Sequence, residues 1–236
     1  MCFITVLGLF PTHDIIGPSM IQLIKSGLAG SADLEVLANQ FRESRVFRLP
    51  RLLHSEVLDI VWSRLDQCAW TTHDDGKIAR EVVPDGLGPL SVLNFVTNTP
   101  EFLDLMRRIT GHDAIRLFTG RVYKMEPSGE HFDTWHADVG SRHKDRLVGM
   151  SINLSPRTYQ GGVFRLRDEA SGQILCELPN TGPGDAIFFE ISPALKHMVS
   201  PLEGSEPKIA YAGWFRSGET DFYSTLRGDS ITVSAD

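Results

Sequence analysis

A histidine and an aspartate stand two residues apart in the segment DTWHADVG, as His136 and Asp138. Residues i and i+2 of a strand point to the same face, so a strand here would present an imidazole nitrogen and a carboxylate oxygen side by side. After the segment GDAIFFE, His197 offers a second imidazole. Two histidines and one carboxylate on one side of a metal leave coordination positions open. That donor set suits Fe(II) holding a chelating acid and dioxygen together.

Other interpretations of these histidines remain open on the residues alone. A His-x-Asp pair arises by chance in many chains of this size, and each histidine read alone is more simply a hydrogen-bonded core or surface residue. His131 and His143 flank the motif without metal-ligand spacing, so both are expected to be surface residues.

The segment KIAYAGWFR, eleven residues after His197, has the pattern of a cavity wall. In a strand Lys208, Ala210, Ala212 and Trp214 share one face. The alanines leave room, and the ammonium group can pair with an anion. An edge-strand lysine facing solvent is the alternative, which a tryptophan on the same face disfavours.

The elements that must carry these residues change type near Gly111. Helical patterns precede it, and after it short apolar runs alternate with Gly and Pro, which predicts a β-sandwich or barrel with helices on one side. Helices are expected over residues 31–44, capped by Ser31 or Asp33; over 54–67, capped by Ser55; and over 99–111, capped by Thr99, with Pro100 first and Gly111 last. Residues 71–90 are expected to form a loop or hairpin.

Composition narrows the functional classes. The 236 residues carry a formal charge of −7, which argues against a general nucleic-acid binder. The three cysteines form no disulfide or metal-binding pattern. No apolar run reaches the roughly 20 residues of a membrane span, and the apolar start has no basic residue before it. The expectation is a cytoplasmic protein without a nucleic-acid or membrane partner, its oligomeric state undetermined.

The segment from about residue 121 to 215 resembles the Fe(II)/2-oxoglutarate-dependent dioxygenases, in particular their prolyl-hydroxylase-like branch. Four segments resemble family features in the same order: RVYKMEPSGEHFDTWHAD, LVGMSINLSPRTYQGGVFRL, LPNTGPGDAIFFE and HMVSPLEGSEPKIAYAGWF. The chain departs from the family pattern in having a lysine, one residue further from the distal histidine, where arginine is more frequent. The resemblance implies an α+β fold with a double-stranded β-helix (jelly roll) core and N-terminal helices packed on one side. Residues 45–228 would form this domain, with a 1–44 extension and a 229–236 tail.

The resemblance also implies roles. His136, Asp138 and His197 would bind the metal and carry catalysis, and Lys208 would pair with the distal carboxylate of 2-oxoglutarate. Tyr123 and Ser151 would line the cosubstrate pocket, although a core tyrosine of the sheet is an equal alternative. The weaker candidates, each more often structural, are Asn153, Trp214 and Arg216.

The implied reaction consumes Fe(II)-bound cosubstrate and O₂, releases succinate and CO₂, and hydroxylates an unactivated C–H bond of a small-molecule, amino-acid or peptide-like substrate. Halogenating relatives lack the metal-binding carboxylate, so Asp138 favours hydroxylation. Two alternatives stay open: a cupin-like metal protein or isomerase without 2-oxoglutarate, and a prolyl-type hydroxylase acting on a partner protein. Substrate choice would depend on residues 1–44, the 71–90 loop and a flap over residues 125–135. The basic segment SRHKDR, residues 141–146, is expected to be a solvated loop.

Overall fold

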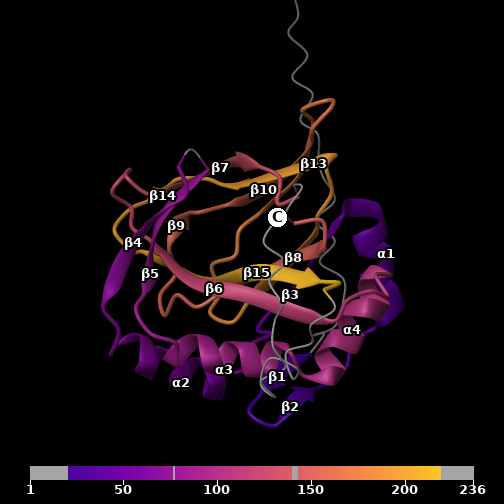
Figure 1. The fold of residues 1–236 in the computed structure, drawn as a ribbon, viewed down its shortest axis with the longest axis horizontal. Coiled ribbons are helices and arrows are strands. Elements are labelled where there is room, and N and C mark those ends of the chain that lie inside the picture. Colours follow the sequence, from indigo (N-terminus) through magenta and orange to yellow (C-terminus); the bar gives the residue numbers. More distant parts are fainter. Residues whose placement is uncertain (1–20, 77, 140–142, 219–236) are drawn as a thin grey trace, which may run out of the picture.

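The computed structural model describes residues 21–76, 78–139 and 143–218. In this part of the chain a long antiparallel sheet curls into a barrel-like jelly roll, and four helices cover its lower side and one flank (Figure 1). The predicted α+β jelly roll with helices on one side is therefore confirmed. None of the helices in the described ranges is both long and apolar enough to cross a membrane.

The helices begin and end at recognisable residues. Their bounds are α1 Leu34–Ser44, α2 Ser55–Leu65, α3 Gly88–Thr97 and α4 Pro100–Thr110. Asp33 caps α1, accepting hydrogen bonds from the backbone N–H groups of Glu35 and Val36. Gly111, at φ 72°, ends α4 in the left-handed conformation that glycine adopts without a Cβ penalty.

Fifteen strands lie in the described residues. They are β1 Gln22–Ile24, β2 Gly27–Ala29, β3 Val46–Leu49, β4 Trp70–Asp74, β5 Ala79–Pro84, β6 Leu117–Met125, β7 Phe132–His136, β8 Arg146–Asn153, β9 Gln160–Gly161, β10 Phe164–Asp168, β11 Ile174–Leu178, β12 Ala186–Glu190, β13 Leu195–Val199, β14 Leu202–Glu203 and β15 Lys208–Arg216. The large sheet runs in the order β11-β10-β13-β7-β5-β6-β15-β8-β12-β3, and β4 pairs with β5 outside this path. This order makes neighbours of β7 and β13, which are far apart in the chain.

The two faces of the sheet bury different cores. On the helix side, Phe47 and Phe188 stack with ring centroids 4.4 Å apart, and Phe102 of α4 contacts Phe188 and Phe215. On the other face lies a second cluster around Phe164 and Phe189, and a third that contains Tyr123, Met125 and Ala210. Because strand side chains alternate, β15 sends Tyr211 and Phe215 to the helices and its even-numbered residues to the inside.

The structure corrects two local expectations. The N-cap of α2 is His54, whose Nδ1 accepts from the Glu56 backbone N–H, and Ser55 is the first helical residue. The expected loop or hairpin over residues 71–90 is the β4–β5 hairpin, but α3 already begins at Gly88. Helix α3 was not predicted, because Leu87 at its N-cap has no capping side chain and its first and last turns carry no charged residue. Pro89 in its first turn was the one start signal present.

The described part of the expected 1–44 extension packs on the domain. Strand β1 and helix α1 contribute Leu23 and Phe41 to the helix-side core, and the Leu23 N–H donates to the Leu52 carbonyl. Residues 1–20 and the predicted 229–236 tail lie outside the described residues. The division at residues 44 and 228 stays a prediction.

Candidate metal centre

Three side chains offer metal-ligand atoms to one point. His136, Asp138 and His197 each place a nitrogen or oxygen within 4.8 Å of the other two. The Nε2 atoms of His136 and His197 lie 3.6 and 3.5 Å from the two oxygens of Asp138. Two imidazoles and one carboxylate with an open side form a donor set that fits Fe(II). We call these three residues the metal end of the cavity.

The strand register brings the two histidines together. His136 closes β7 and pairs directly with His197 of β13, and their rings lie 4.2 Å apart between centroids. His197 is buried and packs against Phe164 and Phe189. Burial lowers the pKa of His197, which favours the neutral imidazole that binds metals.

Neighbours of His136 fix its tautomer. Its Nδ1 lies 2.7 Å from the Thr134 carbonyl oxygen and 3.3 Å from Asp133 Oδ1. A carbonyl oxygen only accepts, so Nδ1 carries a proton, and in the neutral imidazole it is Nε2 that has the lone pair and faces Asp138. Burial acts to lower the pKa of His136, but the Asp133 carboxylate outweighs it and raises the pKa to about 9. A metal must therefore displace a proton from this imidazole near neutral pH.

Asp138 is held in place by two side chains from other strands. The Trp214 Nε1–H donates to its Oδ2 at 2.6 Å, and Arg146, stacked 3.5 Å from the Trp214 ring centre, lies 3.6 Å from its Oδ1. Burial acts to raise the pKa of Asp138, yet His197 and the Trp214 hydrogen bond hold it below its usual range. The carboxylate is therefore ionised and oriented.

The expectation that one strand carries both His136 and Asp138 is wrong. Strand β7 ends at His136, and Asp138 lies in the bend that follows. The two residues meet at the metal end because the chain turns there, and Trp214 fixes where the carboxylate points. The sequence also gave no strand around His197, although β13 is what sets it opposite His136.

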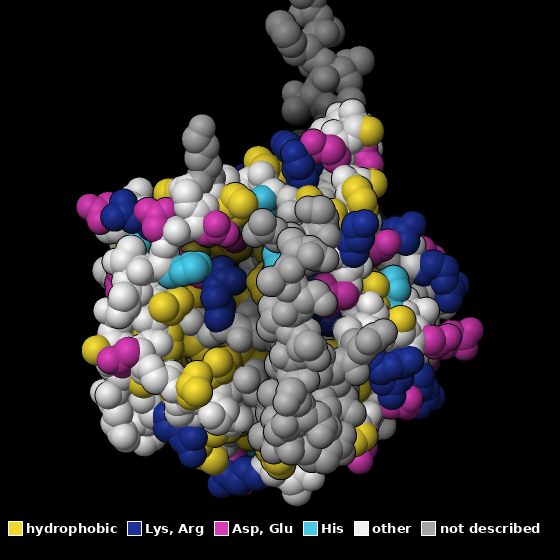
Figure 2. Space-filling view, viewed as in Figure 1, with side chains coloured by type: hydrophobic (Ala, Val, Ile, Leu, Met, Phe, Trp, Pro, Cys, Tyr) yellow, Lys and Arg dark blue, Asp and Glu magenta, His cyan; other side chains and the backbone are white. Residues whose placement is uncertain are grey.

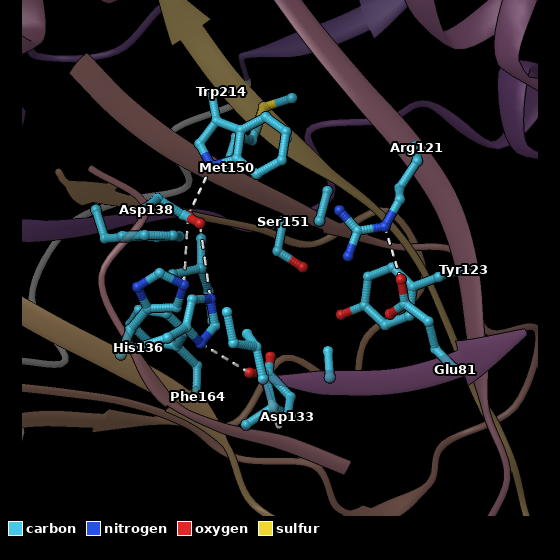
Figure 3. A pocket seen from close by; sticks show the side chains of 18 of the residues that line it. Glu81, Arg121, Tyr123, Asp133, His136, Asp138, Met150, Ser151, Phe164 and Trp214 are labelled. Atoms are coloured by element: carbon cyan, nitrogen blue, oxygen red, sulfur yellow. Dashed lines mark hydrogen bonds and ion pairs between the residues drawn. The ribbon is translucent and has the colours of Figure 1, made fainter. Parts of the chain in front are cut away.

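A cavity of about 310 Å³ extends from the metal end into the barrel. On the face seen in Figure 2, a hollow beside the β4–β5 hairpin has hydrophobic side chains inside it and charged side chains around it. In Figure 3, His136 and Asp138 lie on one side of the cavity, and Arg121 and Tyr123 lie on the opposite side. Ser151 lies between the two groups.

Lys208 lines this cavity and is only 3% exposed. No described residue accepts a hydrogen bond or completes an ion pair with its ammonium group within the distances that define these contacts. Burial lowers the pKa of Lys208 to about 8, while the nearby charges of Asp133 and Glu81 act in the opposite direction. A buried ammonium that faces a cavity without a close anion fits a dicarboxylic cosubstrate.

Tyr123 and Ser151 also line the cavity, on the strands that flank β15. Tyr123 stands opposite Ala210, and Ser151 stands opposite Ala212. Burial raises the pKa of Tyr123, so its hydroxyl stays protonated and can donate a hydrogen bond. The alanine face of β15 thus has a polar side chain on either side.

Among the charged cavity residues that the sequence interpretation did not predict, Arg121 and Glu81 form an ion pair. Arg121 lies two residues before Tyr123 on β6, and its Nε–H donates to Oε1 of Glu81 on β5 at 2.6 Å. Glu81 is buried, and its charge raises the pKa of Arg121 although burial acts to lower it. The i, i+2 spacing from Tyr123 was the signal that could have found Arg121. We call Arg121, Tyr123 and Lys208 the cation end.

The remaining candidates divide between structure and site. Asn153 bonds the Gly182 carbonyl and the Ser155 N–H, and Arg216 pairs with Asp145 at 2.6 Å, so both have structural contacts. Trp214, a weaker candidate, belongs to the metal end through Asp138.

The flanking histidines and the two neighbouring segments also differ in part from expectation. His143 is exposed at the cavity, while His131 is partly buried and accepts from the Glu126 N–H. Of the expected solvated loop over 141–146, residues 141 and 142 lie outside the described residues, and the expectation is wrong for Arg146, which begins β8 and lies against Trp214. Of the expected flap over 125–135, residues 126–131 form the turn between β6 and β7, and the two ends of the segment belong to these strands.

Solved structures share the fold. A Pseudomonas putida prolyl-4-hydroxylase is 14% identical with a TM-score of 0.58, covering 78% of this chain and 98% of its own. A Trichoplax adhaerens prolyl hydroxylase, solved with a hypoxia inducible factor peptide, is 15% identical with a TM-score of 0.58, covering 84% and 93%. The alpha-ketoglutarate-dependent epimerase SnoN from nogalamycin biosynthesis is 14% identical with a TM-score of 0.55, covering 86% and 91%. No curated protein matches the sequence.

Residues 120–216 match the family model described as the 2OG-Fe(II) oxygenase superfamily. This segment contains every residue of the metal and cation ends. The predicted enzyme class, a 2-oxoglutarate-dependent dioxygenase, and the predicted cofactors, Fe(II), 2-oxoglutarate and O₂, are confirmed by this match. Residues 120–216 therefore match the 2OG-Fe(II) oxygenase superfamily, the family that the sequence resemblance indicated.

Proposed function

We propose that this protein hydroxylates an unactivated C–H bond of a small-molecule, amino-acid or peptide-like substrate, converting 2-oxoglutarate and O₂ to succinate and CO₂. One observation carries the proposal. The donor set of His136, Asp138 and His197 shares a cavity with the buried ammonium of Lys208, which has no carboxylate within ion-pair distance among the described residues. A metal bound by the three donor residues and a chelating diacid paired with the Lys208 ammonium would occupy both parts of the cavity.

Each side chain then has a defined task. His136 and His197 would hold Fe(II) through Nε2 and Asp138 through a carboxylate oxygen, and Lys208 would bind the distal carboxylate of 2-oxoglutarate. Fe(II), when bound, supplies the O₂ activation that couples cosubstrate decarboxylation to substrate oxidation. Tyr123 and Ser151 would orient the cosubstrate by hydrogen bonds.

The overall reaction balances without a further reductant. One oxygen atom of O₂ enters succinate as the C–C bond to the departing CO₂ breaks, and the other enters the C–H bond of the substrate. Two of the four electrons that O₂ accepts come from 2-oxoglutarate and two from the substrate. The protein's part is to orient both molecules and to exclude water from the cavity.

Two other functions are compatible with the fold. A cupin-like metal protein or isomerase would use the same triad without 2-oxoglutarate, and it gives the buried Lys208 no task. A prolyl-type hydroxylase would act on a partner protein, as the peptide complex of the Trichoplax structure illustrates for that enzyme. The cavity's modest volume favours a small molecule over a protein loop.

Thermal unfolding with Mn(II), with and without 2-oxoglutarate, tests the cosubstrate. The expected result is one rise in the unfolding temperature with metal and a further rise with 2-oxoglutarate, because each ligand binds only the folded protein. A metal-dependent rise with no further effect of 2-oxoglutarate would favour the cupin-like alternative.

Succinate formation under Fe(II) and O₂, screened over amino acids, small acids and short peptides, then tests the reaction. A substrate is expected to raise succinate formation and to gain one oxygen atom, which mass spectrometry detects. A product without added oxygen, such as an epimer or an alkene, would replace hydroxylation by another oxidative outcome.

A further inference from the structure

We infer that Arg121, oriented by Glu81, binds a carboxylate of the primary substrate, so that the substrate class is a small carboxylic acid. This inference rests on the proposed function, and it concerns the substrate rather than the cosubstrate. It begins from the Arg121–Glu81 pair inside the cavity, which neither metal binding nor cosubstrate binding explains.

The guanidinium of Arg121 is only partly used by the protein. Its Nε–H donates to Glu81 Oε1, and this is its single hydrogen bond to a described residue. The terminal nitrogens point into the cavity toward Ser151, away from Glu81 (Figure 3). Arginine presents its donors as a rigid planar fork that matches a carboxylate in two parallel hydrogen bonds. Glu81 thus fixes the plane of the fork and leaves its outer edge for a ligand.

Arg121 and Lys208 are separate anion subsites. Arg121 pairs with Ala212 on β15, four residues from Lys208, which corresponds to about 13 Å along the strand. The Tyr123 ring lies between them: its centroid is 5.8 Å from Lys208 Nζ and 5.9 Å from Arg121 Cζ. This placement on either side of Tyr123 favours a separate carboxylate for each cation over one carboxylate shared by both.

Register places Arg121 on the metal side of Tyr123. Arg121, Ala212 and Ser151 form one rung across β6, β15 and β8. Trp214, which bonds the Asp138 carboxylate, is two residues further along β15. A ligand held by Arg121 therefore extends between Ser151 and the metal end, where an oxidisable C–H bond must lie.

Charge balance favours a carboxylate over a phosphate. Glu81 already offsets the single positive charge of Arg121, so a dianionic phosphate beside it would add two negative charges to the partly buried cavity. A monoanionic carboxylate adds one negative charge, which the bound metal and Arg146 at the metal end can offset. The volume of about 310 Å³, shared with 2-oxoglutarate, limits the acid to a small one.

Binding of matched acids and amides to the protein loaded with Mn(II) and 2-oxoglutarate tests the inference. The probes are hexanoate and 3-phenylpropionate, each compared with its primary amide, which has the same size and no charge. Calorimetry is expected to show each acid binding about 10- to 100-fold more tightly than its amide, the range of a charge-assisted hydrogen-bond pair. No preference in the wild-type protein overturns the inference, and tighter binding of 2-phenylethylphosphonate overturns the choice of a carboxylate.

The double variant Glu81→Gln/Arg121→Gln replaces the ion pair by two neutral amides and leaves no orphan charge. It is expected to reduce the acid preference to about twofold or less. The matched control is Arg165→Gln/Glu177→Gln, which removes another Nε-to-carboxylate pair of 2.6 Å outside the cavity, with Arg165 exposed to the same 39% as Arg121. This control is expected to keep the preference. Retention of the preference in the first double variant overturns the inference.

Two further results complete the test. If the double variant does not fold, Arg121→Lys is the replacement, because it keeps the positive charge. It is expected to reduce the preference for the acid over the amide at least about threefold, because lysine lacks the planar fork of arginine. An unchanged preference overturns the inference. Loss of 2-oxoglutarate affinity instead of acid preference would make Arg121 a cosubstrate anchor. A wild-type protein that binds no 2-oxoglutarate overturns the proposed function as well, whereas 2-oxoglutarate binding without acid preference overturns only this inference.

Discussion

The two ends of the cavity are both charged, but the protein treats their charges differently. At the metal end every ligand is held by neighbours: Thr134 and Asp133 contact His136, Trp214 bonds Asp138, and Phe164 and Phe189 pack on His197. At the cation end, Lys208 is buried without an ion-pair partner among the described residues, and Arg121 uses one of its donors. The metal end is thus preorganised by the protein, and the cation end is left to be completed by ligands.

This difference has an energetic reason. A metal site gains affinity when the protein fixes ligand orientation before the ion arrives, because no reorganisation is then needed. An anion site must keep its donors available, so a permanent carboxylate partner for Lys208 would compete with the cosubstrate. The cost of the unpaired ammonium appears in the pKa of Lys208, which burial lowers to about 8.

Removal of a proposed metal ligand should have the largest effect. His197→Ala takes one of the two imidazoles, and we expect Mn(II) affinity to fall by more than a hundredfold, since even loss of a supporting contact costs 10- to 100-fold. Succinate formation should be abolished with it. Calorimetric metal titration measures the first effect, and a coupled succinate assay measures the second.

The matched control is His73→Ala, which removes an exposed histidine of β4 outside the cavity. It should bind Mn(II) like the wild-type protein. Unchanged metal affinity in His197→Ala would place the metal elsewhere, and the cavity would then have no metal end to compare with its cation end.

Lys208→Met should separate the cation end from the metal end. Methionine retains most of the side-chain volume and removes the ammonium, so 2-oxoglutarate affinity should fall about 10- to 100-fold while Mn(II) affinity stays within about twofold. Thermal unfolding titrated with each ligand measures both. Lys124→Met, which removes a lysine on the same sheet that is paired with Glu126, is the control expected to change neither.

The sequence could predict the residues that stand in a local motif better than those whose role depends on a distant strand. His136, Asp138 and His197 stand in short motifs of metal-ligand residue types, and Lys208 begins a strand with an alanine face, but the roles predicted for all four came from the family resemblance. A β-sandwich or barrel was predicted from short strands broken by Gly and Pro, the jelly roll from the family resemblance, and the helices α1 and α4 from their caps.

The residues that were missed depend on register and on distant partners. In the sequence, Arg121 looks like an ordinary strand arginine. Its role depends on Glu81, which lies 40 residues away in the chain and is placed beside Arg121 by β5. Arg146 reads as part of a basic loop until Trp214 stacks on it. Asp138 was placed in a strand that ends at His136, because nothing local marks that end. Helix α3 was missed because its N-cap residue makes no side-chain capping hydrogen bond.

Trp214→Phe tests how much of the metal end depends on its supporting contacts. Phenylalanine keeps an aromatic ring for Arg146 to stack on and removes the Nε1–H that donates to Asp138. We expect Mn(II) affinity to fall about tenfold, at the lower end of the range for lost supporting hydrogen bonds. Metal titration measures it, and affinity equal to that of the wild-type protein would show that Asp138 needs no such orientation.

The smallest expected effect is a pH dependence of cosubstrate affinity that arises at the cation end. Lys208 binds an anion only when protonated, and its pKa of about 8 in the empty cavity means that the protonated fraction falls as pH rises through 8. Between pH 7 and pH 8.5 that fraction, and with it 2-oxoglutarate affinity, should fall about fourfold.

The measurement needs saturating Mn(II), because proton release from His136, with its pKa near 9, makes metal binding stronger over the same interval and would mask the trend. Asp133, Glu81 and Tyr123 are the other titratable groups near Lys208. The two acids act to keep it protonated, and Tyr123 stays neutral throughout. In Lys208→Arg the guanidinium does not titrate below pH 12, so its 2-oxoglutarate affinity should be flat from pH 7 to 8.5. An equal pH dependence in this variant would assign the titration to a group other than Lys208. The affinity of the cation end for 2-oxoglutarate would then depend on that other group.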